Sequence, residues 1–467
     1  MDVAQSSVSE SAAPEVEPAL ADVQRLVVSA FAHLPWARYH LLRFDQGAEV
    51  APARRWLASL ADDLPSAEVR DEERALAVAF TADGLAALAT SPDLMATFPR
   101  SFRQGMAHPY RSRLLGDTGD SAPDGWSWGG PGSVPHVLVA QFCRTAEQLT
   151  DESQTLTDAA AAVGLTVDRS IDTMLLPDGV EHFGFADGIS QPVMAGTEWA
   201  GRASAPRWDV VAPGEFVLGL LDELGLVAEF PQIGELEVGR HGSYLVMRQI
   251  EQHVDLFHDH LGEEAAARGV PVDDLASELV GRRRDGASLA IGAPDAVPGE
   301  RPSNDFGYGQ DPLGVGCPLG SHVRRANPRD GTRADSDAAR EEARRSANRH
   351  RLLRRGRPYG PGDDSRTGDE PRGLLFLAFN ADIERQFEFV QHTWLGNPTF
   401  AGLSGELDPI TVEQPSGGGR FSVPQRPVRD RLDGLPSFTT TRGGAYFFLP
   451  GIEGLRLLMG DAVVDPG

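Results

Sequence analysis

The chain has 467 residues, more than one ordinary domain needs, and 41% of them are hydrophobic, enough to build a buried core. Its formal net charge is -25, and all 43 basic residues are arginines. An acidic chain is a poor general binder of nucleic acid or of anionic membranes, because both contacts depend on a basic surface. Only two cysteines occur, so neither a disulfide framework nor a paired-cysteine metal site is expected.

The N-terminus, residues 1–20, is acidic and rich in serine, alanine and proline, which predicts a disordered tail. It contains no basic segment, twin arginine or apolar core of a secretion signal. No later stretch approaches the ~20 apolar residues of a membrane span. We therefore expect a cytoplasmic protein that does not bind membranes.

Strand and helix patterns alternate along both halves of the chain. Apolar runs predict strands, in chain order, at 39–44, 74–80, 137–142, 243–248, 373–379 and 444–449. Helical spacing predicts helices at 51–62, 82–88, 146–163, 249–261 and 381–394, with Thr81 as a helix N-cap. This alternation favours an α+β fold of two related sandwiches, with a boundary near residue 235.

A carboxylate framed by glycines stands in the segment EHFGFADGIS, at Asp187. Gly184 and Gly188 permit backbone conformations and close approaches that side chains forbid. Beside Phe183 and Phe185, a carboxyl in a partly apolar niche can serve as an acid–base group. An ordinary acidic turn explains the same residues, because aspartate and glycine are common in turns.

A histidine in the segment GCPLGSHVRRANPRD, His322, precedes Arg324 and Arg325. A neutral imidazole is a common axial ligand of haem iron, and arginines pair with carboxylates such as haem propionates. The alternative is a solvated histidine at the edge of a basic loop. Three further histidines in HVDLFHDH fit no familiar zinc spacing and favour a charged helix end.

A second basic segment, HRLLRRGRPYG, places Arg354 and Arg355 directly before Gly356 and Pro358. An arginine held by such a turn can project a permanent positive charge and several hydrogen-bond donors into a pocket. The alternative is a basic turn on the surface.

These segments, in this order, resemble the dye-decolourising peroxidase family, most closely its longer bacterial and fungal forms. The resemblance rests on GFADG, SHVRRANPR, LLRRGRPYG and RGLLFLAFNADIERQFEFVQ, and it covers roughly residues 35 to 455. It implies an α+β fold of two ferredoxin-like sandwiches, of the dimeric α/β-barrel type. The N-terminal domain, 21–235, would carry the distal acid loop, and the C-terminal domain, 236–467, would bind one haem b.

The resemblance also implies roles for single residues. His322 would be the proximal ligand of the iron, Asp187 the distal acid and Arg354 the distal arginine, with Arg355 the choice if the register slips by one. Glu388 is expected to accept a hydrogen bond from the other ring N–H of His322, with Asp382 as the second candidate. The residues expected to bind the cofactor are His322, Gly184, Phe185, Gly188, Arg324, Arg325, Leu374, Phe376 and Glu388.

Leu374 and Phe376 resemble an apolar pair that narrows the distal pocket, although strand-core packing alone would explain them. Where some relatives carry a polar residue two positions after the distal arginine, this chain has Gly356. Tyr359 and Trp394 are candidate surface radical residues, or are merely structural.

The implied function is a haem peroxidase that reduces hydrogen peroxide through a ferryl intermediate and oxidises bulky dyes, phenols or other one-electron donors. The alternatives are a haem-binding or haem-handling protein with incidental activity and a scaffold or cargo protein that has lost catalysis. A binding protein needs the ligand His322 but not both Asp187 and Arg354. Because a free aspartate ionises near pH ~4, activity at acidic pH is expected. The expected partners are hydrogen peroxide and an organic donor, with a homodimer as a candidate assembly.

Overall fold

The protein is described here by a computed structural model, which covers residues 20–45, 47–69, 73–197, 200, 209–294, 300, 302–331, 336–362, 370–425, 428–460 and 463–464. The segment expected to be a disordered tail, apart from Leu20, lies outside the described residues. No helix in the described ranges is long and apolar enough to cross a membrane.

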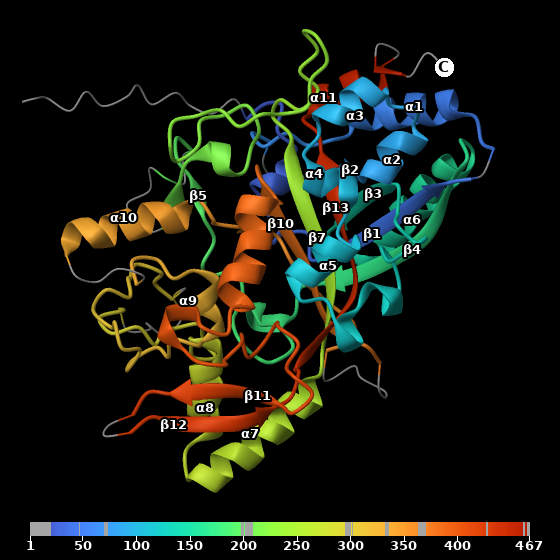
Figure 1. The fold of residues 1–467 in the computed structure, drawn as a ribbon. Helices are drawn as coiled ribbons and strands as arrows, with labels where there is room; N and C mark the ends of the chain where they lie inside the picture. The colour runs from blue at the N-terminus through green and yellow to red at the C-terminus, as the bar shows by residue number, and fades with distance from the viewer. Residues whose placement is uncertain are drawn as a thin grey trace, which may run out of the picture.

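The centre of the molecule is one sheet in the order β7-β13-β2-β3-β1-β4-β9-β10-β8, and a further pairing between β7 and β10 closes it into a ring (Figure 1). Its strands are β1 (Trp36–Phe44), β2 (Arg74–Phe80), β3 (Val137–Cys143), β4 (Leu165–Met174), β7 (Ser243–Gln252), β8 (Leu353–Arg354), β9 (Arg357–Tyr359), β10 (Gly373–Asn380) and β13 (Thr439–Leu449). Two small sheets pair β5 (Val193–Met194) with β6 (Val210–Val211) and β11 (Gly419–Val423) with β12 (Asp430–Leu435).

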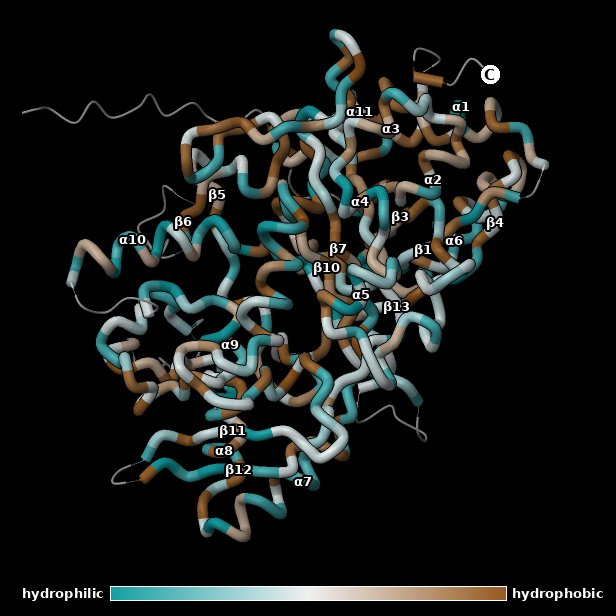
Figure 2. Tube along the Cα trace, viewed as in Figure 1, coloured by the Kyte–Doolittle hydropathy of each residue, from teal (hydrophilic) through white to brown (hydrophobic). Residues whose placement is uncertain are grey.

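The ring separates two hydrophobic cores. Alternate residues of every strand, such as Leu375 and Leu377 of β10, pack with one another inside the ring. Residues of the opposite parity, such as Ala378, face outwards and pack against the surrounding helices. Figure 2 shows hydrophobic residues concentrated along the central strands and hydrophilic residues along α10.

The helices surround the ring and build a second lobe beside it (Figure 1). The α-helices are α1 (Val50–Ser59), α2 (Ala82–Ala87), α3 (Pro92–Thr97), α4 (Arg100–Gln104), α5 (Pro109–Leu115), α6 (Ala146–Ala161), α7 (Val254–Arg268), α8 (Val272–Val280), α9 (His322–Ala326), α10 (Asp337–Asn348) and α11 (Ile452–Met459). The helix predicted at 381–394 is confirmed over residues 384–395, where its turns are those of two π-helices, η8 (Glu384–Glu388) and η9 (Val390–Leu395). Short 3-10 helices are η1 (Arg25–Val27), η2 (Leu60–Asp62), η3 (Gly119–Ser121), η4 (Pro123–Gly125), η5 (Pro177–Gly179), η6 (Pro213–Glu215) and η10 (Phe400–Gly402).

All six predicted strands are confirmed, and so is the cap of α2, where the Thr81 hydroxyl accepts from the Gly84 amide at 3.0 Å. The helix predicted from residue 249 was placed too early, because β7 continues to Gln252 in register with β10 and β13. Strands β1 to β4 come from the first half of the chain, and β7 to β10 and β13 from the second half. Residue 235 lies in the connection between β6 and β7, and the domain boundary there stays a prediction.

Candidate functional site

The register of β8 and β9 on β10 decides which arginine faces outwards. Arg354 pairs with Ala378, and Arg357 pairs with Leu375, so Gly356 lies opposite Phe376 without a break in register. Arg354 therefore shares the outer face with Ala378 and Phe376, while Arg355 points into the ring. There the Arg355 guanidinium donates to the Val27 carbonyl at 2.8 Å.

The segment from Glu181 to Gly188 forms a loop around one buried carboxylate. The Glu181 carboxylate accepts from the backbone amides of Phe183 and Phe185, both at 2.9 Å, and from the Gln252 amide at 2.5 Å. Phe183 and Phe185 are buried in the lobe's core. This arrangement leaves Asp187 exposed, next to Gly188 at a φ of +73°.

The predicted role of Gly184 in admitting a flat ligand is not the role its surroundings indicate. Gly184 has a φ of +88°, and a Cβ there would lie 2.9 Å from the Arg284 guanidinium. That guanidinium donates to the Phe183 carbonyl at 2.6 Å and lies 4.9 Å from the Phe185 ring centroid. Gly184 and Phe185 therefore shape the loop from inside, and Asp187 and Gly188 form its open side.

The loop docks directly onto Arg354. The Arg354 guanidinium donates to the Ser190 carbonyl at 3.0 Å, and its backbone amide donates to the Gln191 side chain at 3.1 Å. Burial lowers the pKa of Arg354, and the charge of Asp187 acts in the opposite direction. Two segments that are far apart in the sequence thus bring a carboxylate and a guanidinium to one place.

His322 is the first residue of α9 and is oriented by a buried aspartate. Its Nδ1 lies 3.0 Å from Asp408 Oδ2, and Asp408 Oδ1 accepts from the backbone amides of Ile410 and Thr411 at 3.1 and 2.8 Å. Burial lowers the pKa of His322, but the Asp408 carboxylate outweighs it, so the pKa is raised. Since Nδ1–H donates to Asp408, the lone pair of Nε2 stays available as a ligand.

The expectation that Glu388 or Asp382 supports His322 is wrong. Glu388 is buried elsewhere, where it accepts from the Arg111 guanidinium at 2.5 Å and from the Tyr446 hydroxyl at 2.9 Å. Asp382 accepts from the backbone amide of Arg385 at 3.0 Å. The functional residue that sequence reasoning missed is Asp408, in GELDPIT, whose only local signal is that of a turn.

The expectation that Arg324 and Arg325 pair with cofactor carboxylates is also corrected. Arg324 donates to the Asp311 carboxylate at 3.0 Å and to the Cys317 carbonyl at 2.6 Å. Arg325 donates to backbone carbonyls of Trp394 and Glu406, at 2.9 and 2.7 Å. Both guanidinium groups are buried and hold α9, and hence His322, against its surroundings.

Leu374 and Phe376 are half-buried on the outer face of β10, the face that carries Arg354. Their alternate neighbours on the inner face are fully buried. The two candidate radical residues are not on the surface, because Tyr359 is 5% exposed and Trp394 is 9% exposed. A role for either in direct oxidation of a bulky substrate is therefore not supported.

The residues present fit a haem group. His322 retains 28% of its side-chain exposure, and no described residue hydrogen-bonds its Nε2. The charges of Arg354 and Asp187 both act on the pKa of His322, which places all three in one neighbourhood. Near Arg354 lies a buried polar cluster, in which Arg282 and Arg329 donate to the Asn304 side chain, and Asn304 and Arg351 donate to the Asp209 carboxylate.

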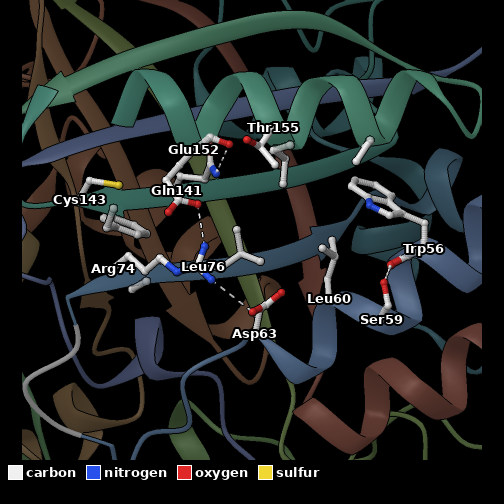
Figure 3. A pocket seen from close by; sticks show the side chains of 14 residues that line it. Trp56, Ser59, Leu60, Asp63, Arg74, Leu76, Gln141, Cys143, Glu152 and Thr155 are labelled. Atoms are coloured by element: carbon white, nitrogen blue, oxygen red, sulfur yellow. Dashed lines mark hydrogen bonds and ion pairs between the residues drawn. The ribbon is translucent and has the colours of Figure 1, made fainter. Parts of the chain in front are cut away.

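A pocket of about 240 Å³ lies on the other half of the ring, between α1 and α6 (Figure 3). Arg74 spans it, reaching Glu152 at 2.6 Å and Asp63 at 3.5 Å. Burial raises the pKa of its one thiol, Cys143, to about 11, so that group is a poor nucleophile at neutral pH. The pocket shares no residue with the site around His322.

The three histidines of HVDLFHDH do not form a metal site. His253 Nε2 lies 2.8 Å from the Thr440 hydroxyl, and the His260 ring lies 5.8 Å from that of Phe438. Among the described residues, no group of three or more histidine, cysteine or acidic side chains is placed to hold a metal ion.

Comparison with known proteins adds one family match, one similar sequence and two similar solved structures. Residues 231–428 match the family described as Dyp-type peroxidase, C-terminal. The chain is 34% identical over 347 residues to the multifunctional dye peroxidase DyP2 of an Amycolatopsis species, covering 68% of each protein. The solved structure of that relative covers 96% of this chain with a TM-score of 0.74 and 28% identity. The solved structure of a DyP-type peroxidase from Anabaena covers 94% of both chains with a TM-score of 0.80 and 24% identity. The predicted fold class is thereby confirmed.

Proposed function

We propose that this chain, which belongs to the Dyp-type peroxidase family and is a peroxidase, binds one haem b through His322 and uses Asp187 and Arg354 to reduce hydrogen peroxide. The observation that carries the proposal is the orientation of His322. Asp408 fixes its Nδ1, while its Nε2 is left without a hydrogen bond from any described residue. A histidine held in this way is a preformed axial ligand.

When bound, haem would be held by His322 and would supply the redox chemistry of the reaction. Asp408 keeps the imidazole in the tautomer that can bind iron, and its negative charge makes the imidazole a more basic ligand. Arg324 and Arg325, through their contacts to the segments around α9, hold the ligand in position.

Asp187 and Arg354 would act on peroxide. Asp187 is exposed on the open side of its loop, so it can take a proton from one peroxide oxygen and return it to the other. Arg354, fixed through Ser190 and Gln191, offers its remaining N–H donors to the negative charge that develops as the O–O bond breaks. Gly356, opposite Phe376, adds no polar group to this set.

The donors we propose are dyes, phenols or other compounds that give up one electron at a time, because relatives of this chain are named as dye peroxidases. Such molecules would be oxidised at the edge of the site. The half-buried Leu374 and Phe376 would narrow the entrance of the site, so that only molecules about the size of peroxide could pass.

The test compares haem-loaded wild type with Asp187→Asn, Arg354→Leu and Arg355→Leu in peroxide-dependent oxidation of an anthraquinone dye. We expect kcat to fall about 100-fold in each of the first two variants, as it does when a proton-transfer group or a charge-stabilising donor is removed. Arg355→Leu is the matched control, because Arg355 is the neighbouring arginine but faces the apolar interior of the ring. Unchanged kcat in Arg354→Leu would contradict its role.

A second measurement separates the peroxidase from a haem-handling protein. The Soret spectrum of His322→Ala should differ from that of the wild type, since the axial ligand is removed. If His322→Ala bound haem with an unchanged spectrum, the axial assignment would be wrong. If the wild type bound haem but oxidised no donor, the haem-handling alternative would stand.

A further inference from the structure

Tyr446 is a buried phenol that is hydrogen-bonded to a buried carboxylate. It lies on the outer face of β13, is 2% exposed, and donates its hydroxyl proton to Glu388 Oε1 at 2.9 Å. Glu388 is 1% exposed, and its other oxygen accepts from the Arg111 guanidinium at 2.5 Å. The proposed reaction of the site uses neither Tyr446 nor Glu388.

The strand register places Tyr446 in line with Arg354. Tyr446 pairs with Val246, Val246 with Ala378, and Ala378 with Arg354, so one row of outward-facing residues crosses four strands. Neighbouring strands lie about 4.8 Å apart, which puts the backbones of Tyr446 and Arg354 about 14 Å from each other.

Aromatic rings fill the space over that row. The Tyr446 ring centroid lies 6.2 Å from that of Phe387, and Phe387 lies 6.2 Å from Phe376. Phe376 lies on the same face as Arg354 and is half-buried there. The rings therefore run without interruption from the face of the candidate site to the phenol.

The surroundings of the phenol favour loss of its electron and proton together. Burial raises the pKa of Tyr446 well above its ordinary value, and the charge of Glu388 raises it further, so the phenol does not ionise by itself. Burial also raises the pKa of Glu388, while Arg111 acts against this shift. Glu388 is thus a carboxylate with an increased proton affinity, already at hydrogen-bond distance from the phenol.

We propose that Tyr446 is an internal store for one oxidising equivalent of the peroxide-treated enzyme. In this step the O–H bond of Tyr446 breaks, the electron passes along the rings to the oxidised site, and the proton moves to Glu388 Oε1. The products are a neutral tyrosyl radical and a protonated Glu388. One electron from an organic donor and return of the proton from Glu388 restore both groups. The inference rests on the proposed function, because hydrogen peroxide is the oxidant.

The role that follows is protective. Reaction with one peroxide leaves two oxidising equivalents, and a donor that arrives late would find one of them held on a residue shielded from solvent. The hydrogen bond to Glu388 keeps the proton nearby, so the store can be emptied without chemical damage. An exposed tyrosine would instead couple to other molecules.

The test uses haem-loaded full-length protein, mixed with one equivalent of hydrogen peroxide without a donor and frozen within milliseconds. Electron paramagnetic resonance should show a tyrosyl radical in the wild type, identified by narrowing of the signal when tyrosine is deuterated at its β carbon. Tyr446→Phe should lose this signal, and Tyr359→Phe, which alters another buried tyrosine, should retain it. Thermal melting and the Soret band, recorded for each variant, show that it is folded and loaded.

Glu388→Gln tests the proton transfer. Glutamine keeps a hydrogen-bond acceptor for Tyr446 but is not a base, so the radical signal should be lost although the phenol remains. This change also removes one of the two carboxylates paired with the buried Arg111, the other being Glu384. If Glu388→Gln does not fold, Tyr446→Phe decides the matter.

Two results with the variants would overturn the inference: a tyrosyl signal that persists in Tyr446→Phe, or a tyrosyl signal that disappears in Tyr359→Phe instead. A third would be the absence of a tyrosyl signal in wild type although its absorption changes with peroxide. If peroxide leaves the wild-type absorption unchanged, the proposed function itself fails and the store fails with it.

Discussion

Asp408 is fully buried, and its two oxygens serve different partners. Oδ1 accepts from the amide and hydroxyl of Thr411 and from the Ile410 amide and lies 3.2 Å from His322 Nδ1, whereas Oδ2, at 3.0 Å from Nδ1, faces His322. In Asp408→Asn the amide oxygen would keep the bonds from Thr411 and Ile410, so the NH₂ group would face His322. An NH₂ donor at that place favours the tautomer of His322 without a proton on Nδ1, which is the wrong one for binding through Nε2. We expect haem affinity, measured by Soret titration, to fall about 10- to 100-fold.

Asp382→Asn is the control for this substitution, since Asp382 only caps the start of η8 and pairs with Arg385. Equal haem affinity in Asp408→Asn and wild type would show that the carboxylate does not support the ligand.

The sequence predicted His322 and Arg354 as residues of the candidate site but did not point to Asp408. Local motifs made the histidine and the arginine visible, and alternation along β8 explains why Arg354 rather than Arg355 faces outwards. Asp408 lies 86 residues from His322, and its bonds to Ile410 and Thr411 are those of a turn. A partner brought in by tertiary packing leaves no signal in its own neighbourhood, and an acid on a predicted helix, Glu388, was therefore preferred.

Glu278 on α8 gives a pH dependence that can be tested. Burial, with the charges of Asp274 and Asp430 added, raises its pKa from 4.5 to about 7. A raised carboxyl pKa contributes stability that is full below pH 4.5 and is lost as the pH rises through about 7. At pH values above 7, Glu278→Gln should therefore have a higher denaturation midpoint than wild type. At pH 4 the two proteins should have the same midpoint. An equal rise in Glu263→Gln, on the exposed side of α7, would argue against this cause.

At the scale of elements, the loop around Asp187 depends on two glycines in different surroundings. A Cβ on Gly184 would meet the Arg284 guanidinium, whereas no heavy atom of the described residues lies within 4 Å of a Cβ on Gly188. Both have positive φ, so Gly188→Ala should cost about 1 kcal/mol from backbone strain, and Gly184→Ala about 2 kcal/mol, because the steric contact adds to the strain. Chemical denaturation measures both, and an equal loss would contradict the contact with Arg284.

The helix expected at 381–394 shows which features of an element its sequence pattern cannot predict. Apolar spacing indicates a helix there, but it cannot show the wider turn of η8 and η9 or the bonds to distant segments, such as those that the Gln386 side chain donates to the carbonyls of Glu215 and Arg351. The same segment puts Phe387 and Glu388 onto the outer face of the sheet. Periodicity could not reveal that the segment carries the partner of Tyr446.

On the scale of the whole molecule, the two halves of the chain share both cores. The inner core joins Ala77 of β2 to Leu377 of β10, and the outer core joins Val78 of β2 to Tyr446 of β13. We therefore expect one cooperative unfolding transition, coincident by tryptophan fluorescence and far-UV circular dichroism, despite the predicted boundary at 235. Two separated transitions, or a folded fragment of residues 236–467, would contradict it.

The order of strands in the ring also matters while the chain is being made. Strand β13 follows all the other described strands in chain order, yet it lies between β7 and β2. Until the ribosome has made β13, both neighbours present unpaired edges that invite association with other chains. Nascent chains of this protein should therefore depend on chaperones until β13 is made, and messages truncated before Thr439 should give aggregates instead of shortened enzymes.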